Sequence, residues 1–312
     1  VETSARIAAE FEATGFEVTS RVGGLGVVGV LRNGDGPTLM LRTDLDALPI
    51  GEQTGLPYQS RLRTENPDGR VGGVMHACGH DGHTTMLLGA AALLVDEPPP
   101  LPVRLIFQPA EETGRGAPAM IRAGVLEDVA MIFGGHVDRH YPAGSVVVTP
   151  GAVNASSDRF QIQISGQGGH AARPHESIDA VVVGSLMVMA IQTIVSREVN
   201  PAHPSVVTVG RFDAGTAANV IAGQAVLEGS IRAQDPSVRE HLHISIRRIA
   251  NSVAQLHGAH VEVAIDEGTP PLINSEPLAE LARQAAQQAV GPDNVLRMTT
   301  ANMGGEDFSY YM

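Results

Sequence analysis

Three short, continuous apolar runs in the first half of the chain constrain its fold most. They lie at residues 38–42, 103–107 and 129–133, and helical patterns separate them at residues 84–95 and 117–123. Continuous apolar runs are typical of strands buried on both faces of a parallel sheet. Their alternation with helices predicts an α/β layered domain.

The pattern changes after Gly151. Residues 159–165 alternate polar and apolar side chains with period two, as in a strand with one solvated face. The following elements are expected at residues 178–195 (helix), 205–212 and 224–232 (strands), 237–256 (helix) and 260–265 (strand). This β-α-β-β-α-β order is that of the ferredoxin-like fold. We therefore expect one domain at residues 1–152 plus 268–312, interrupted by a second domain at residues 153–267.

Charge and cysteine content argue against two classes of protein. The chain has 34 acidic and 21 basic residues and a formal net charge of −13, whereas nucleic-acid binding needs a basic surface. A single cysteine excludes an internal disulfide framework. We find no apolar run of membrane-spanning length, and residues 181–191 are typical of a buried helix. We expect no nucleic-acid or membrane partner, and take the cytoplasm as the default location.

The segment His76-Ala-Cys-Gly-His-Asp-Gly-His83 is the densest cluster of chemistry-bearing residues. Thiolate and imidazole are the preferred ligands of zinc and similar metals. Cys78 and His80 are two positions apart, so in extended backbone their side chains point the same way. Gly79 and Gly82 relax the backbone beside them. The cluster predicts metal binding.

Further metal-type residues follow three of the predicted strands. Glu111 and Glu112 come after residues 103–107, His136 comes after residues 129–133, and Asp44 and Asp46 come after residues 38–42. The carboxyl ends of parallel strands are where α/β enzymes place their ligands. One of the two adjacent glutamates can bind a metal while the other acts on water.

These motifs resemble the M20 metallopeptidase family, in particular its aminoacylase and hippurate-hydrolase branch of amidohydrolases. The resemblance covers nearly the whole chain. It rests on Asp44-Leu-Asp46-Ala-Leu-Pro, His76-Ala-Cys-Gly-His-Asp, Gln108-Pro-Ala-Glu-Glu112, Gly135-His136, Gly168-Gly-His-Ala-Ala-Arg-Pro-His175, Asn219-Val-Ile, Gly229-Ser-Ile-Arg232 and Gly305-Glu-Asp-Phe-Ser309. The fold implied is an αβα-layered catalytic domain with a mostly parallel sheet and an inserted ferredoxin-like lid and dimerisation domain.

The resemblance implies two divalent metal ions per subunit, Zn, Mn, Co or Ni. The family's ligand positions fall on Cys78, His80, Glu112 and His136. Glu111 matches the catalytic carboxylate, which would take a proton from water and pass it to the leaving nitrogen. Asp46 would orient a ligand imidazole. The implied reaction is hydrolysis of the amide bond of an N-acyl amino acid, or of a similar amide with a free carboxylate.

The inserted domain contributes by the same resemblance. His170 would reach the active site of a partner subunit in a homodimer and stabilise the developing oxyanion. Asn219 and Arg232 match positions that hold the substrate, and Arg232 can clamp a carboxylate through two hydrogen bonds.

Several alternatives remain open on the sequence. Cys78 could act as a nucleophile with a nearby histidine, the substrate could be a short peptide cleaved by a dipeptidase or carboxypeptidase, or the chain could bind metal without catalysis. The chain starts with Val1 rather than an initiator methionine, directly before a predicted helix at residues 3–14, and it lacks the C-terminal ligand histidine of the family. We therefore expect a chain truncated at both ends and an incomplete second metal site.

Overall fold

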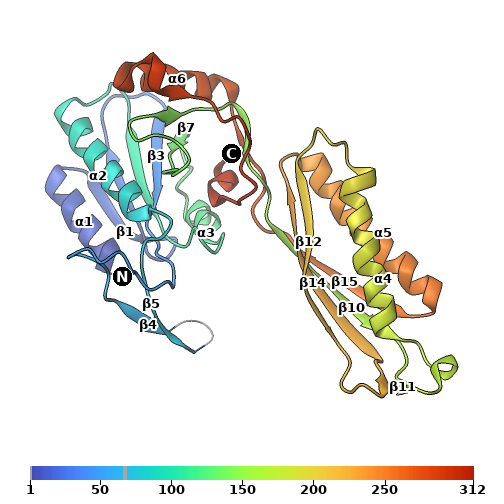
Figure 1. Ribbon diagram of the computed structural model, residues 1–312. Coiled ribbons are helices and arrows are strands. Elements are labelled where there is room, and N and C mark those ends of the chain that lie inside the picture. Colours follow the sequence, from blue (N-terminus) through green and yellow to red (C-terminus); the bar gives the residue numbers. More distant parts are fainter. Residues whose placement is uncertain (1, 66–68) are drawn as a thin grey trace. The chain divides into compact units, whose positions relative to one another are not determined.

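A computed structural model describes residues 2–65 and 69–312 (Figure 1). The chain forms two compact units, Val1–Ser145 with Tyr311 and Val146–Tyr310 with Met312. In the first unit the helices and strands are α1 (Glu2–Thr14), β1 (Glu17–Val22), β2 (Gly26–Leu31), β3 (Thr38–Asp44), β4 (Arg63–Glu65), β5 (Val71–Gly73), α2 (His80–Asp96), β6 (Val103–Gln108), α3 (Gly116–Arg122) and β7 (Val129–Gly134).

A five-stranded sheet in the order β1-β2-β6-β3-β7 forms the centre of the first unit. β6, β3 and β7 pair in parallel, whereas β2 is antiparallel to both β1 and β6. Four of the five strands therefore point the same way, and the sheet is mostly parallel as the apolar runs predict. The β1–β2 hairpin, which the sequence analysis did not anticipate, completes the sheet.

Helices cover both faces of this sheet. Leu105 and Phe107 of β6 lie in one core with Phe11 of α1 and Leu87 of α2. The alternate residue Arg104 points to the opposite face, where its Nη1 donates to the carbonyl oxygens of Val125 (2.6 Å) and Glu127 (2.8 Å), just after α3. The three layers are therefore α1 with α2, the sheet, and α3.

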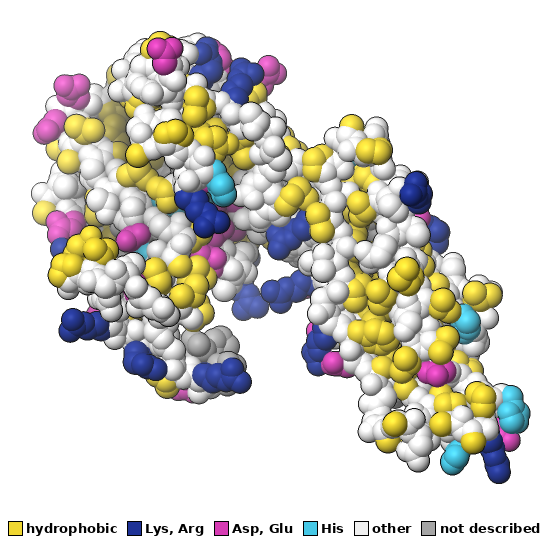
Figure 2. Space-filling view, viewed as in Figure 1, with side chains coloured by type: hydrophobic (Ala, Val, Ile, Leu, Met, Phe, Trp, Pro, Cys, Tyr) yellow, Lys and Arg dark blue, Asp and Glu magenta, His cyan; other side chains and the backbone are white. Residues whose placement is uncertain are grey.

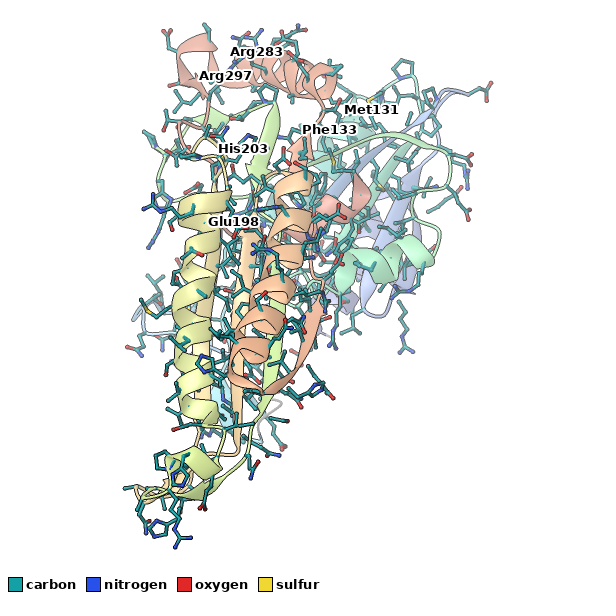
Figure 3. All side chains as sticks on the ribbon, turned by 90° about the vertical axis from the view of Figure 1, so that its right-hand side faces the viewer. Met131, Phe133, Glu198, His203, Arg283 and Arg297 are labelled. Atoms are coloured by element: carbon teal, nitrogen blue, oxygen red, sulfur yellow. The ribbon has the colours of Figure 1, made fainter. Side chains whose placement is uncertain are left out.

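β7 departs from the prediction of a strand buried on both faces. Met131 and Phe133, labelled in Figure 3, are only half-buried. In the described part of the chain β7 pairs only with β3, so it forms an edge of the sheet. The apolar run predicted the strand correctly but overestimated its burial, because burial depends on neighbours that periodicity does not specify.

The second unit contains a β-α-β-β-α-β succession and shorter elements on either side. They are β8 (Val146–Val147), β9 (Gly151–Asn154), β10 (Asp158–Ser165), β11 (Gly169–His170), α4 (Ala180–Thr193), a π-helical turn (Ile194–Glu198), β12 (Ser205–Ala214), β13 (Val220–Ile221), β14 (Gln224–Ala233), α5 (Pro236–His257), β15 (His260–Asp266), β16 (Leu272–Asn274), α6 (Glu276–Val290) and β17 (Val295–Leu296). Short 3₁₀ turns lie at Pro174–Glu176, Pro292–Asn294 and Asp307–Tyr311.

An antiparallel sheet in the order β12-β14-β10-β15 forms the centre of this unit. Ile162 of β10, Leu227 of β14, Met187 of α4 and Ile246 of α5 are fully buried in one core. One face of the sheet is therefore covered by the two helices, and the alternating burial of β10 matches its period-two sequence. Asp179 and Asp235 cap the two helices by accepting hydrogen bonds from backbone amides of the first turn.

α4 and the π-helical turn form one apolar helix, where the sequence analysis predicted a helix at residues 178–195. Within the described residues, Ala180–Glu198 is the one helix that is long and apolar enough to cross a membrane. Its side chains Val183, Met187 and Ile191 are buried in the core of the unit, as in the core helix of a globular domain. Figure 3 shows Glu198 at its end, where the carboxylate pairs with Arg248 of α5 at 2.6 Å.

The compact units divide the chain differently from the expected domains. The division falls after Ser145, and residues 268–310 group with the second unit. β9 pairs with β16 and β8 pairs with β17, so the segments on either side of the four-stranded sheet are tied to each other. The membership of residues 268–312 in the catalytic domain stays a prediction.

Candidate metal centre

The start of α2 brings Cys78 and His80 together. Cys78 lies in a turn, Gly79 has φ +88°, and His80 is the first residue of the helix. The left-handed conformation at Gly79 is one that a side chain disfavours. The expectation that extended backbone aligns Cys78 with His80 was therefore wrong. A glycine-dependent turn aligns them instead, while Gly82 lies within the helix.

The two glutamates follow β6 in a tight turn. Ala110 has φ +57°, which is uncommon for a residue other than glycine, and its carbonyl oxygen accepts from the amide of Gly116 at 3.1 Å. A Cβ at Gly116 would lie 1.7 Å from the carbonyl oxygen of Pro109, so glycine is required there. The turn places Glu111 and Glu112 beside the start of α2.

All the metal-type residues that the sequence analysis selected in this unit gather around His80. Ligand atoms of Cys78, His80 and His136 lie within 4.8 Å of one another, and so do those of His80, Glu111 and Glu112. The Cys78 Sγ lies 3.4 Å from His136 Nε2. The His80 Nε2 lies 3.9 Å from Glu112 Oε1. Two ligand groups thus share one histidine.

Backbone oxygens orient the two candidate ligand histidines. His80 Nδ1 donates to the carbonyl oxygen of Asp46 at 2.9 Å, and His136 Nδ1 donates to the carbonyl oxygen of Val137 at 2.7 Å. With the proton on Nδ1, the Nε2 atom of each ring has a free lone pair. Both Nε2 atoms point toward the shared cluster.

Asp46 links His80 to the glutamate turn. Its Oδ2 accepts from the backbone amide of Glu112 at 3.0 Å, and its Oδ1 lies 3.4 Å from His80 Nδ1. One carboxylate therefore contacts both the candidate ligand histidine and the segment that carries the glutamates, and the orienting role of Asp46 stays a prediction.

Sequence reasoning gave no role to His83, and it left the role of Asp44 open. His83 is 2% exposed, and its Nδ1 lies 2.7 Å from Asp44 Oδ1. Asp44 Oδ2 in turn accepts from Arg42 Nη1 at 2.9 Å. The cluster Asp44, His80 and His83 has metal-type atoms within 4.8 Å of one another. We do not assign it a metal, because both ring nitrogens of His83 and both oxygens of Asp44 are already hydrogen-bonded.

The remaining predicted residues lie in the second unit. His170 in β11 pairs with Val220 in β13, and the amide of Ala171 donates to the carbonyl oxygen of Asn219 at 3.2 Å. His170 and Asn219 are therefore close together. β14 begins just after β13, near His170 and Asn219. Arg232 lies near the other end of β14. At about 3.3 Å per residue, it is roughly 25 Å from the start of the strand.

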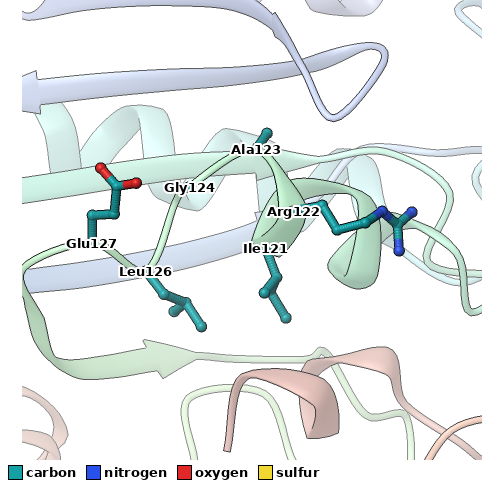
Figure 4. Close-up of a pocket in the computed structure, with 6 residues that line it drawn as sticks. All are labelled: Ile121, Arg122, Ala123, Gly124, Leu126 and Glu127. Carbon is teal, nitrogen blue, oxygen red and sulfur yellow. The ribbon is translucent and has the colours of Figure 1, made fainter.

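One shallow surface hollow lies away from these residues. It is lined by Ile121, Arg122, Ala123, Gly124, Leu126 and Glu127 at the end of α3 (Figure 4). It shares no residue with the cluster around His80. We assign it no function.

Comparison with known proteins decides the family. The sequence profile of Peptidase family M20/M25/M40 matches residues 40–312, which is most of the chain. The chain belongs to this family. It is a hydrolase, and its relatives place it among the M20 amidohydrolases, as the motifs predicted.

Three similar proteins are informative. The N-acetyl-L-cysteine deacetylase of Bacillus subtilis is 39% identical over 284 residues, which cover 89% of this chain and 64% of that protein. The hippurate hydrolase of Campylobacter jejuni is 38% identical over 315 residues, which cover 99% of this chain and 79% of that protein. The YXEP protein of Bacillus subtilis, a dinuclear metal binding peptidase from the M20 family, has a similar structure. Its TM-score is 0.86 at 34% identity, with 100% of this chain and 79% of that chain covered.

The residues of this M20 chain fit a pair of cations. Among the described residues, the buried atoms His80 Nε2 and Asp46 Oδ1 have no hydrogen-bond partner, and buried polar atoms without partners are rare. The surrounding donor set of thiol, imidazole and carboxylate suits Zn, Mn, Co or Ni. A cation beside His80 Nε2 would satisfy that atom and neutralise the glutamates.

Electrostatics in the metal-free site favours cation binding. Burial raises the pKa of Cys78, and the nearby charge of Glu112 adds to this effect, so that it reaches about 12. Burial lowers the pKa of His80, but the hydrogen bond to Asp46 and the charges of Asp44 and Asp46 raise it to about 9. The carboxylates of Asp44, Asp46 and Glu112 therefore give this cluster a negative potential, which attracts a cation.

We expect Gly79→Ala to disrupt this M20 site. A Cβ at Gly79 would lie 2.4 Å from Val137 Cγ2, and the backbone there has φ +88°. The clash and the strained backbone are expected to lower the free energy of unfolding by about 1–3 kcal/mol. They would also push the His136 segment away from Cys78. Urea denaturation of the metal-free protein and its metal content measure both effects.

Gly82→Ala is the matched control for this substitution. Gly82 lies in α2, and a Cβ there would meet no atom within 4 Å. Alanine is about 1 kcal/mol better than glycine inside a helix, so the control is expected to be at least as stable as the wild type. Equal stability and metal content of the two variants would contradict the role of Gly79.

Proposed function

We propose that the chain catalyses the metal-dependent hydrolysis of the amide bond of an N-acyl amino acid. The convergence of Cys78, Glu111, Glu112 and His136 on the unpartnered Nε2 of buried His80 carries the proposal. The names of the relatives support the substrate class, because N-acetyl-L-cysteine and hippurate are both N-acyl amino acids. The choice between acyl groups is left to experiment.

Cys78, His80, Glu112 and His136 would hold the two cations in this proposal. When bound, such ions act as Lewis acids toward the amide carbonyl and lower the pKa of water. Glu111 is half-buried and lies within 4.8 Å of the ligand atoms of His80 and Glu112. We assign it the transfer of a proton from the attacking water to the leaving nitrogen.

Arg232 is proposed to bind the free carboxylate of the substrate. It is half-buried on an inner strand, and in the described part of the chain its guanidinium has no acidic partner. A Cβ at Gly305 would lie 3.5 Å from Arg232 Nη1 and 2.9 Å from Thr269 Oγ1. Thr269 Oγ1 is itself buried without a hydrogen-bond partner among the described residues. The two groups leave a small polar cradle suited to a carboxylate.

Arg232→Ala should discriminate between substrates with and without a carboxylate. Loss of one charged hydrogen-bonding group typically costs 2–5 kcal/mol in binding, which is roughly a 30- to 5000-fold loss in kcat/KM for an N-acyl amino acid. The corresponding N-acyl amino acid amide should be affected much less. Steady-state kinetics on the two substrates measures the difference, and equal losses on both would refute the assignment.

Residues 153–267 are proposed to be a ferredoxin-like lid that forms a homodimer. His170 Nδ1 accepts from the amide of Ala172 at 3.1 Å, so Nε2 carries the ring proton and can donate to an oxyanion. Because His170 lies beside β13, just before β14 begins, whereas Arg232 lies near the far end of β14, they cannot both reach one small substrate from a single lid. This supports the proposal that His170 and Asn219 serve the site of a partner subunit.

The outer face of α4 supports a second copy as the partner. Val181, Val182, Leu186 and Met189 are 41–69% exposed on this helix, and Figure 2 shows hydrophobic side chains over this region. Exposed apolar patches of this kind mark association surfaces. Size-exclusion chromatography with light scattering should report a dimer, and a monomer at micromolar concentration would contradict the use of His170 in trans.

Of the alternatives from the sequence, this geometry argues against the cysteine nucleophile. A cysteine nucleophile needs a thiolate, whereas burial and the adjacent carboxylates raise the pKa of Cys78 to about 12. It would also leave the two glutamates without a role. A dipeptidase or carboxypeptidase would use the same site, and a metal-binding homologue without catalysis would keep it.

A panel of substrates tests the proposal. Benzoylglycine, N-acetyl-cysteine and a dipeptide are incubated with the protein before and after EDTA treatment and with divalent ions added back. Hydrolysis of the acyl amino acids that EDTA removes and metal restores is the expected result. Activity that survives chelation would overturn it, and cleavage of the dipeptide alone would favour the peptidase alternative.

A further inference from the structure

A network of buried hydrogen bonds connects β3 to the segment that carries His136. Arg42, Asp44 and His83 have exposed fractions of 6%, 1% and 2%. Arg42 Nη1 donates to Asp44 Oδ2 at 2.9 Å, and His83 Nδ1 lies 2.7 Å from Asp44 Oδ1. Burying three polar side chains together is costly unless each finds partners. Packing alone therefore does not explain why Arg42, Asp44 and His83 are buried together.

The Nε2 atom of His83 connects this network to Val137. The backbone amide of Val137 donates to His83 Nε2 at 2.9 Å. An amide can only donate, so Nε2 is unprotonated and the single ring proton is on Nδ1, where it is donated to Asp44. Asp44 thus fixes one neutral tautomer of His83, and the positive charge of Arg42 balances the carboxylate.

Val137 links His83 to His136, which is a candidate metal ligand. Its carbonyl oxygen accepts from His136 Nδ1 at 2.7 Å, and this leaves His136 Nε2 directed at Cys78 Sγ, 3.4 Å away. Both polar groups of Val137 are therefore engaged, the amide by His83 and the carbonyl by His136. Val137 lies in irregular backbone after β7 and is 47% exposed, so no ladder of a sheet or helix holds it in place.

We propose that His83 is a positioning residue for the metal centre: through the amide of Val137 it fixes the segment that presents His136 Nε2 to the cations. The proposal rests on the metal-dependent function given above. It deepens that function by adding a residue that touches neither metal nor substrate. Partners that orient a ligand in this way typically change metal affinity by 10- to 100-fold.

Two conservative variants separate positioning from simple packing. His83→Asn keeps a donor near the Nδ1 position for Asp44 but has no acceptor for Val137. His83→Gln places an acceptor near the Nε2 position but has a weaker match to Asp44. Competition with a chelating dye measures Zn²⁺ affinity. We expect a 10- to 100-fold loss for His83→Asn and a change of only a few-fold for His83→Gln, with far-UV circular dichroism showing that both are folded.

Hydrogen exchange on the wild-type protein provides a test that needs no variant. In the metal-free protein the amide of Val137 should exchange slowly despite its exposed side chain, because His83 accepts its hydrogen bond. Fast exchange of this amide would overturn the proposal, and so would wild-type Zn²⁺ affinity in His83→Asn. Failure of the wild type itself to bind Zn²⁺ would instead contradict the proposed function.

Discussion

Replacing Glu111 by glutamine should lower kcat by about 10²–10⁴-fold while both metal ions stay bound. The change removes a group that can take up and release a proton, and general acid–base catalysis contributes about that factor. Glu111 follows β6 in the turn that begins at Ala110, and it lies within 4.8 Å of the ligand atoms of His80 and Glu112. Turnover of an N-acyl amino acid and elemental analysis of the purified variant measure the two parts of this prediction.

Glu127→Gln is the control, since Glu127 is an exposed glutamate beyond α3 and lies outside the cluster. It should leave both kcat and metal content unchanged. If Glu111→Gln kept near wild-type turnover, Glu111 could not be the proton carrier. If it lost metal together with activity, Glu111 would instead act as a ligand.

Replacing His80 by alanine should abolish metal binding at micromolar concentration and reduce turnover to background. His80 belongs to both ligand groups, the one with Cys78 and His136 and the one with Glu111 and Glu112. It is fully buried, and Asp46 fixes its orientation. Removal of this side chain therefore affects both cations, whereas loss of Cys78 or Glu112 would remove a ligand from one group only.

His140→Ala is the matched control for this variant. The His140 side chain is 72% exposed and pairs with Asp138 on the surface, where such a pair contributes little. Isothermal titration with Zn²⁺ and Mn²⁺ compares the two variants. A full complement of metal in His80→Ala would show that the cations bind elsewhere.

The sequence predicted most of the regular elements and which strand ends bring candidate ligands together. The apolar runs located β3, β6 and β7, and the carboxyl ends of these strands meet at one edge of the sheet. For that reason the sequence alone places Glu111, Glu112 and His136 at the same edge of the sheet, where the structure brings them close to His80. The period-two pattern likewise located β10 with its one solvated face.

Features that depend on local backbone geometry could not be predicted in the same way. Between Cys78 and His80 the sequence predicted extended backbone, whereas Gly79 has a left-handed conformation. The positive φ of Ala110 could not be predicted because alanine rarely adopts this conformation. The half-burial of β7 reflects its position at a sheet edge.

His83 shows the limit of motif reading most clearly. It stands in the same eight-residue cluster as Cys78 and His80, and residue type alone does not distinguish a ligand from its support. Only the coordinates show that both its ring nitrogens are occupied, by Asp44 and by the amide of Val137. The residues around His83 in the sequence do not indicate these two hydrogen bonds.

Metal content measured together with activity tests the central claim most directly. The wild-type protein, loaded with Zn²⁺ or Mn²⁺ and freed of excess by gel filtration, is analysed for metal per chain and assayed on benzoylglycine and N-acetyl-cysteine. The account predicts two divalent ions per chain, and activity that falls as EDTA removes them and returns when they are restored. A folded protein that binds no divalent metal would contradict the account.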